Sequence, residues 1–229
     1  METMKLSNRL KRVASFVPEG ATLLDVGSDH AYLPIYLLQK EQIARAIAGE
    51  VVEGPYQSAV KNVAQQGLTE QIEVRLANGL AAFEPADSVS TIVIAGMGGR
   101  LIAEILENGR AKLAGVERLI LQPNNREDDL RTWLMTHDFQ IIAEDILEEA
   151  GKIYEILVVE SGQQTLSAQG LRFGPFLCQE QSPVFQQKWQ KELGKLDYAL
   201  QQIPEANQAD RALLQGKIQQ IKEVLHVSE

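Results

Sequence analysis

The chain has 229 residues, of which 45% are hydrophobic and 23% are charged, the balance of an ordinary soluble globular protein. This composition excludes a disordered polymer, a collagen-like fibre and a disulfide-rich secreted scaffold. With 31 acidic and 22 basic residues the net charge is −9, which disfavours a dedicated nucleic-acid coat protein but is compatible with a local basic surface. The single cysteine, Cys178, excludes an intramolecular disulfide. Neither a signal peptide nor an apolar run of the roughly 18 residues in a membrane span is present, so we expect a cytoplasmic protein.

The opening segment predicts a helix that ends before Pro18, because its apolar residues follow the spacing of one helical face: Leu6, Leu10, Val13 and Val17. Lys5, Arg9 and Arg12 fall on a second stripe of the same predicted helix. This stripe is the best local basic surface of the sequence. An ordinary solvated helix face is the alternative interpretation.

Beyond Gly20, short apolar segments alternate with helix-like stretches. Strands are expected at residues 21–26, 44–50, 72–76, 91–95 and 118–121. Helices are expected at residues 31–39, 55–66, 99–107 and 127–136. Near-continuous apolar strands separated by helices indicate a parallel sheet that is covered on both faces. The pattern therefore predicts a doubly wound α/β domain.

The end of this domain departs from a purely parallel sheet. Residues 139–147 and 153–160 both resemble strands, and only a five-residue connection separates them. A connection this short forms an antiparallel hairpin, because a parallel crossover needs a dozen or more residues. A nicotinamide-binding Rossmann sheet is parallel throughout. The predicted fold class is therefore the α/β Rossmann-like class I methyltransferase fold, by analogy at the level of the fold.

The C-terminal segment has apolar residues spaced by three and four positions on either side of Pro204: Phe185, Trp189, Leu193, Leu196, Leu200 and Ile203, then Leu214, Ile218, Ile221 and Leu225. This spacing predicts an antiparallel helical hairpin of the coiled-coil type. We expect two domains, a Rossmann-like domain at residues 1–162 and a hairpin-containing segment at residues 163–229. From residue 184 onward, the acidic residues match the basic residues in number, so the hairpin is expected to recognise a partner by shape.

The first candidate site follows the first strand, in the run from Asp25 to Tyr32. Ligands of doubly wound sheets bind outside the carboxyl ends of the strands, and Gly27 allows a close approach to the backbone. Capping of the next helix would explain Asp29 equally well. Capping does not require His30 and Tyr32 beside Asp29. Asp29 could both cap the helix and serve the ligand site.

The second and third strands end in further polar residues. Glu50 lies 25 residues after Asp25, where a carboxylate can accept hydrogen bonds from both hydroxyls of a ribose; a surface acid is the alternative. Asn78 and Gly79 follow the third strand. An asparagine side chain can read an adenine edge, whereas a plain Asn-Gly turn is the alternative.

The fourth strand ends in a glycine-rich run around Met97, which contains Gly96, Gly98 and Gly99. Missing side chains leave room for a cofactor and a substrate to meet, and the Met97 thioether can lie against a flat ring; a tight turn is the alternative. After the fifth strand, Asn125 is best interpreted as a helix start. The sequence contains no Walker A loop, nucleophile elbow or zinc-ligand spacing, so no metal is expected.

In combination, these motifs resemble the bacterial TrmK family, whose members use S-adenosyl-L-methionine to methylate N1 of adenine 22 in tRNA. The resemblance rests on DVGSDHAYLP (25–34), GEVVEGP (49–55), NGL (78–80), AGMGG (95–99) and LQPN (121–124). It extends over essentially the whole chain, including the helical tail. It implies S-adenosyl-L-methionine as the cofactor and tRNA, near its D-arm, as the partner.

The resemblance also implies roles for individual residues. The residues that would bind the cofactor are Asp25, Gly27, Ser28, Glu50, Val51, Asn78, Gly79, Gly96 and Met97. Asp29 would stabilise the cationic product, His30 and Tyr32 would orient the base, and the stripe of Lys5, Arg9 and Arg12 would bind RNA. We expect a monomer, although the helical hairpin could mediate self-association. A small-molecule methyltransferase and a non-catalytic nucleotide sensor or scaffold are the alternative functions.

Overall fold

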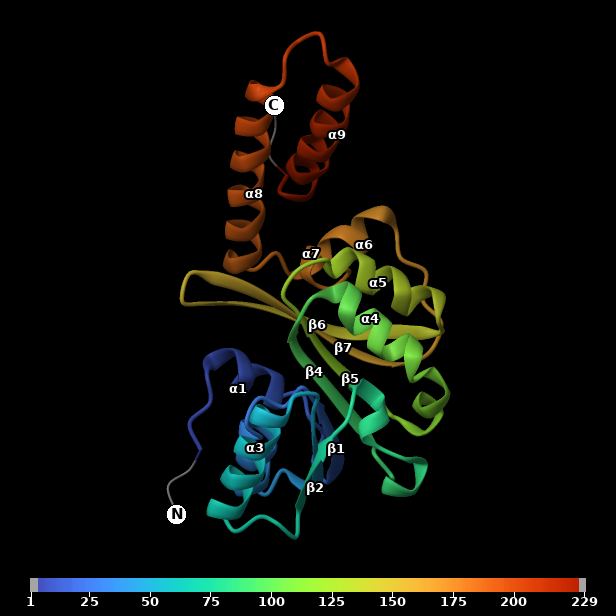
Figure 1. Cartoon of the computed structure of the whole chain (residues 1–229). Coiled ribbons are helices and arrows are strands. Elements are labelled where there is room, and N and C mark those ends of the chain that lie inside the picture. Colours follow the sequence, from blue (N-terminus) through green and yellow to red (C-terminus); the bar gives the residue numbers. More distant parts are fainter. Residues whose placement is uncertain (1–3, 227–229) are drawn as a thin grey trace.

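The computed structural model describes residues 4–226, and its centre is a seven-stranded sheet of order β3-β2-β1-β4-β5-β7-β6 (Figure 1). The strands are β1 (Ala21–Val26), β2 (Ile43–Glu50), β3 (Ile72–Leu76), β4 (Thr91–Met97), β5 (Arg118–Pro123), β6 (Phe139–Glu149) and β7 (Lys152–Ser161). Strands β1 to β5 are parallel, whereas β7 runs antiparallel to both β5 and β6. The predicted fold class, with its antiparallel end, is confirmed.

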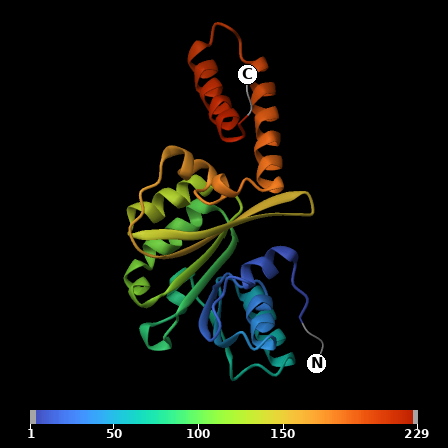
Figure 2. The same ribbon diagram turned by 180° about the vertical axis from the view of Figure 1, so that it is seen from behind.

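Helices cover both faces of the sheet (Figures 1 and 2). One face packs against α1 (Asn8–Ala14), α2 (Tyr32–Gln39) and α3 (Glu53–Gln65), and the other against α4 (Gly99–Asn108) and α5 (Glu127–Thr136). Short 3-10 segments lie at Gly79–Ala82, Pro85–Asp87 and Arg110–Gly115.

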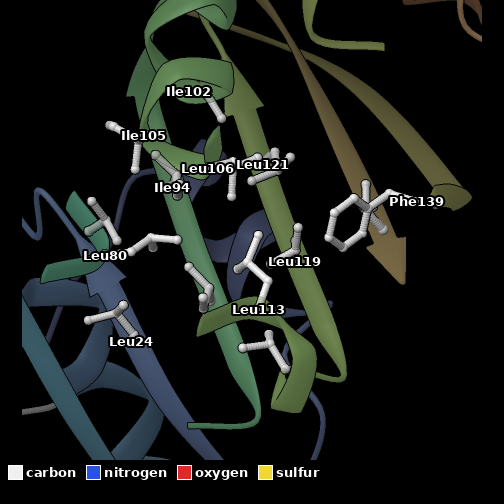
Figure 3. Packing of buried hydrophobic residues seen from close by; sticks show 14 of the residues in the cluster. Leu24, Leu80, Ile94, Ile102, Ile105, Leu106, Leu113, Leu119, Leu121 and Phe139 are labelled. Carbon is white, nitrogen blue, oxygen red and sulfur yellow. The ribbon is translucent and has the colours of Figure 1, made fainter. Parts of the chain in front are cut away.

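The central strands are apolar along their length because both of their faces are buried. Figure 3 shows the face under α4, where Leu24 and Ile94 of the sheet share one cluster with Ile102 and Leu106 of the helix. All four side chains are fully buried. This core holds the carboxyl ends of β1 and β4 in fixed positions.

The first helix is shorter than the sequence predicts. It begins at Asn8 because the Ser7 hydroxyl accepts a hydrogen bond from the Leu10 amide (3.2 Å) and caps it. Lys5 therefore lies outside the helix. The expectation that Lys5, Arg9 and Arg12 share one helical stripe is wrong as a statement of geometry.

The tail forms α6 (Ala168–Phe173), α7 (Leu177–Glu180), α8 (Pro183–Gln202) and α9 (Gln208–Val224). Helices α8 and α9 pair as the predicted hairpin and project away from the sheet (Figure 1). The predicted domain boundary at residue 162 adjoins the end of β7 at Ser161, and the division into two domains stays a prediction. Residues 1–3 and 227–229 of those domains lie outside the described chain.

Charged side chains fix the base of the helical hairpin to the sheet domain. Arg131 is fully buried beside Glu144 and Glu155, and Lys188 of α8 lies 2.7 Å from Glu155 and 2.9 Å from Glu127. Burial alone would raise the pKa of Glu155, but Lys188 and Arg131 hold that pKa below its usual value. Buried charges persist when they are paired in this way, so the hairpin is anchored beside α5 and β7.

Candidate active site

The ends of β1 and β2 form one continuous edge. Val26 is in register with Gly49, and the amides of Gly27 and Ser28 donate to the Gly49 carbonyl at 2.9 and 3.1 Å. Glu50 therefore lies beside the loop that follows β1. The structure thus brings together the first two motifs predicted from the sequence.

Asp25 is buried at this edge, where the Ser28 hydroxyl donates a 2.6 Å hydrogen bond to its carboxylate. Burial raises the pKa of Asp25 to about 7; Ser28 opposes the rise, and the charges of Glu50 and Asp29 add to it. Three carboxylates thus converge here, so the edge favours a cationic ligand.

Glu50 carries the clearest sign of a missing ligand. Its side chain is buried, and Oε1 has no hydrogen-bond partner among residues 4–226. Burial raises the pKa of Glu50, while the backbone amides of Asp29 and His30 oppose the rise. An unsatisfied buried acceptor is costly. Hydroxyl donors of a ribose would satisfy it, so this observation fits a nucleoside-containing cofactor.

The loop after β1 has an uncommon backbone. Asp29, His30 and Ala31 have φ angles of 47°, 69° and 59°, a left-handed run that non-glycine residues adopt only where the surroundings enforce it. Ala31, not Asp29, precedes α2, and no side chain caps the helix. The capping interpretation of Asp29 is therefore wrong.

The left-handed run leaves the Asp29 side chain 84% exposed. His30 Nε2 lies 3.4 Å from Asp29 Oδ1, and the His30 and Tyr32 rings are 5.4 Å apart. The side chain of Asn62 donates to the His30 carbonyl at 3.0 Å and holds the loop. The three residues predicted to serve the substrate therefore lie together.

The third and fourth strands complete the edge. A Cβ at Gly27, whose φ is +67°, would lie 2.5 Å from the Met97 methyl group, so the loop after β1 touches the end of β4. Asn78 is exposed after β3, while Gly79 is buried with a φ of +54°. Close contact with Met97 and a positive φ both favour glycine at position 27, and a positive φ favours glycine at position 79.

Gln122 and Asn124, which belong to the LQPN motif but were given no role from the sequence, link β4 to β5. The Asn124 amide group donates to the Gly96 carbonyl (2.7 Å), and the Asn124 backbone amide donates to the Met97 carbonyl (2.7 Å). The fully buried Gln122 donates to Asn124 Oδ1 at 3.1 Å. Arg126, not Asn125, precedes α5, so the helix-start interpretation of Asn125 is wrong.

The predicted RNA-binding residues occupy different places. Arg9 donates from Nη1 to Gln122 Oε1 at 2.6 Å, next to the β4–β5 edge. Arg12 pairs with Asp145 of β6 at 2.8 Å, and Lys5 is exposed before α1. Their role in binding RNA stays a prediction.

A groove of about 1340 Å³ separates the sheet domain from the helical hairpin. It starts at Asn124 and Asn125, beside the β4–β5 edge, and passes the β6–β7 turn at Gly151. Its cationic lining residues are Arg126, Lys152, Arg172, Lys188, Lys191, Lys195 and Lys217. Among residues 4–226, three acidic residues line it: Glu127, Asp128 and Glu192.

This groove corrects the expectation that the tail recognises a partner by shape and not by charge. The basic and acidic residues of the tail do match in number, but the fold separates them. Four tail lysines line the groove, while Asp197, Glu205, Asp210 and Glu223 do not. Seven basic against three acidic residues reverse the overall excess of acids at this one surface, which favours a polyanionic partner.

Other roles can be tested within the described range: metal binding, nucleophilic catalysis and membrane anchoring. Among residues 4–226, no group of three or more His, Cys, Asp and Glu side chains could hold a metal ion. Burial raises the pKa of the Cys178 thiol to about 11, so this residue packs as a small apolar side chain, not as a nucleophile. No helix within the described range is long and apolar enough to cross a membrane.

The strand order, the antiparallel β7 and the carboxylate-rich edge define a Rossmann-like methyltransferase fold. The profile of the TrmK family, tRNA (adenine(22)-N(1))-methyltransferase, matches residues 23–223. The Bacillus subtilis tRNA (adenine(22)-N(1))-methyltransferase is 44% identical over 237 aligned residues, covering 98% of this chain and 99% of that protein. The chain belongs to the TrmK family, and the resemblance recognised in its motifs is confirmed.

Solved structures agree with this assignment. Sp1610 of Streptococcus pneumoniae, assigned as a tRNA (m1A22) methyltransferase, is 72% identical with a TM-score of 0.96, covering 97% of this chain and 100% of that one. Its complex with S-adenosyl-L-methionine has a TM-score of 0.92 at 70% identity, with the same coverage.

Proposed function

We propose that this protein methylates N1 of adenine 22 in tRNA with S-adenosyl-L-methionine as the methyl donor. Family membership and the cofactor complex of the pneumococcal relative support the proposal. In the structure of residues 4–226, the observation that carries it is the buried oxygen of Glu50 that has no partner in that range, at a carboxylate-rich edge. A nucleoside with a cationic group satisfies both features.

The cofactor supplies an electrophilic methyl group on its sulfonium, and the chain's residues bind and orient it. Glu50 accepts hydrogen bonds from the ribose hydroxyls of the cofactor, and Asn78 and Gly79 contact the adenine ring of the cofactor. Val51, 57% exposed directly after Glu50, offers an apolar surface to the same ring. Asp25, which accepts a hydrogen bond from the Ser28 hydroxyl, contributes the anionic side of the site, and Gly27, Gly96 and Met97 line the passage to the substrate.

The target base lies against Asp29, His30 and Tyr32 in this proposal. Adenine N1 carries a lone pair at neutral pH, so no residue has to remove a proton before the attack. The methylated ring is cationic, and a carboxylate held beside it stabilises the charge as it develops. The Asp29 side chain is exposed, so a substrate base can reach it, and Asn62 holds the loop that carries it. The aromatic rings of His30 and Tyr32 keep the base in line with the methyl group.

The basic groove is the proposed surface for the D-arm region of tRNA. It opens beside Asn124, so a backbone bound along the lysines of α8 and α9 passes the β4–β5 edge. The N1 edge of a paired or stacked base is hidden, so the nucleotide has to turn out of the RNA to reach the site. A cytoplasmic location accords with this substrate, and a monomeric state stays a prediction.

Cofactor affinity is expected to depend on pH through Asp25. Its pKa of about 7 means that acidification protonates it and removes a negative charge that favours a cationic ligand. Between pH 7.5 and pH 6.0 the Kd should therefore rise by up to about eightfold. Calorimetric titration with S-adenosyl-L-methionine measures this.

Asp25→Asn is the matched control because it cannot ionise, so its Kd should vary much less over this range. Titration of the cofactor's own amino group affects both proteins equally. Equal pH profiles for the two proteins, or tighter binding at pH 6.0, would show that Asp25 does not control cofactor affinity.

Methyl transfer itself separates the proposed function from its rivals. Labelled cofactor should transfer its methyl group to total tRNA and not to a metabolite extract. Label in small molecules alone would establish a small-molecule methyltransferase. Cofactor binding without transfer to either pool would favour a sensor or scaffold.

A further inference from the structure

Helix α1 is clamped against the β6–β7 hairpin and directs one arginine to the reaction edge. The amides of Asn8 and Arg9 donate to the Glu149 carboxylate at 2.6 and 3.3 Å. The Arg9 guanidinium donates to the fully buried Gln122 at 2.6 Å and lies over the Tyr154 ring, 5.4 Å from its centroid. These contacts fix the guanidinium between β5 and β7.

The fixed guanidinium retains unused hydrogen-bond donors. Arginine has five N–H groups in a planar fork, and Nη1 accounts for the single side-chain hydrogen bond that Arg9 makes within residues 4–226. Its Nε and Nη2 groups therefore have no protein acceptor in that range. The side chain is only half-exposed, so a bound anion would compensate donors that water reaches incompletely.

Arg9 lies between the end of β4 and the basic groove. A Cβ at Gly96 would lie 3.6 Å from Nη1, so the missing side chain leaves the space between the guanidinium and the end of β4 open. Tyr154, whose ring lies under the Arg9 guanidinium, also lines the basic groove. Arg9 thus stands where the groove meets the proposed methylation site.

We propose that Arg9 binds a phosphate of the target nucleotide through Nε and Nη2. The proposal rests on the proposed function, because it requires RNA in the groove. Planar guanidinium groups bind phosphate oxygens through two parallel hydrogen bonds. The methylated base is cationic and would repel the Arg9 guanidinium, whereas the backbone phosphate of the same nucleotide would attract it. Arg9 is therefore assigned to the phosphate and Asp29 to the base.

The test compares Arg9→Gln, Arg9→Lys and Lys11→Gln. Lys11 is an exposed cation of the same helix and has no part in the proposed site, so it controls for the loss of one charge. For Arg9→Gln, kcat/KM for tRNA should fall about 10- to 100-fold, the range for a hydrogen bond to a charged group. The slope of log affinity against log salt should become shallower by about 0.7 to 0.9. The Kd for the cofactor should stay within about threefold.

Arg9→Lys should restore the salt slope but not the full kcat/KM, because one ammonium cannot hold Gln122 and grip a phosphate with a planar fork. An unchanged salt slope in Arg9→Gln, or parallel losses of cofactor affinity and kcat/KM, would overturn the assignment in favour of a structural role. An equal defect in Lys11→Gln would also overturn the assignment, because it would show that tRNA responds to the total positive charge and not to Arg9 in particular. The proposed function has a separate test in the unaltered protein: it would fail if that protein bound tRNA but transferred no methyl group to it. Results with the Arg9 variants alone test only the role of Arg9.

Discussion

Replacing Asp29 by alanine should lower kcat for methyl transfer about 100- to 1000-fold, the range seen when one preorganised electrostatic group is removed. The reason is that Asp29 is an exposed carboxylate 3.4 Å from His30, whose ring lies 5.4 Å from that of Tyr32. Cofactor affinity should change little, because Asp29 is assigned to the charge that forms on the base. Single-turnover methylation of tRNA and calorimetric titration of the cofactor measure the two quantities separately.

The left-handed backbone at Asp29 makes the choice of control important. Its φ of 47° disfavours alanine, whereas asparagine tolerates this region. Asp29→Asn therefore removes the charge while preserving shape and backbone. It should lose nearly as much kcat as Asp29→Ala. Full activity in Asp29→Asn, or equal losses of cofactor binding and kcat, would contradict the assignment of Asp29 to the developing charge.

Changing Lys191, Lys195 and Lys217 together to glutamine should weaken tRNA binding about 100-fold at moderate salt. These lysines face the groove from α8 and α9, and each phosphate contact that is lost makes the salt slope shallower by about 0.7 to 0.9. The slope should therefore fall by about two units or more. Filter binding of tRNA over a range of salt concentrations measures both effects.

A second triple variant separates groove charge from net charge. Lys40, Lys61 and Lys222 are outside the groove, so their replacement by glutamine makes the same charge change elsewhere. That control should bind tRNA within about threefold of the unaltered protein. Equal losses in both triple variants would show that tRNA responds only to total charge, and the groove would no longer be its binding surface.

The sequence predicted the parts of the site that follow directly from strand ends. Asp25, Gly27 and Glu50 could be placed together because parallel strands bring their carboxyl ends to one edge. The helical hairpin could be predicted because the spacing of apolar residues records which face of each helix is buried. In both cases the information is local and periodic.

The remaining features depend on tertiary contacts that local patterns do not record. Arg9 and Gln122 are 113 positions apart, and their contact depends on how α1 docks against the sheet. Local sequence does not record the left-handed run from Asp29 to Ala31, so a capping role for Asp29 looked reasonable until the backbone was known. The basic groove was missed because matched numbers of opposite charges conceal their separation in space.

The most direct test of the account uses an unmodified tRNA transcript whose residue 22 is adenine, incubated with the protein and S-adenosyl-L-methionine and then copied by reverse transcriptase. A methyl group on N1 blocks Watson–Crick pairing, so the account predicts a strong stop at position 22 that requires the cofactor. A transcript with guanine at that position should give no such stop. Full-length copying after incubation with folded, cofactor-binding protein, or a stop at another base, would contradict the account.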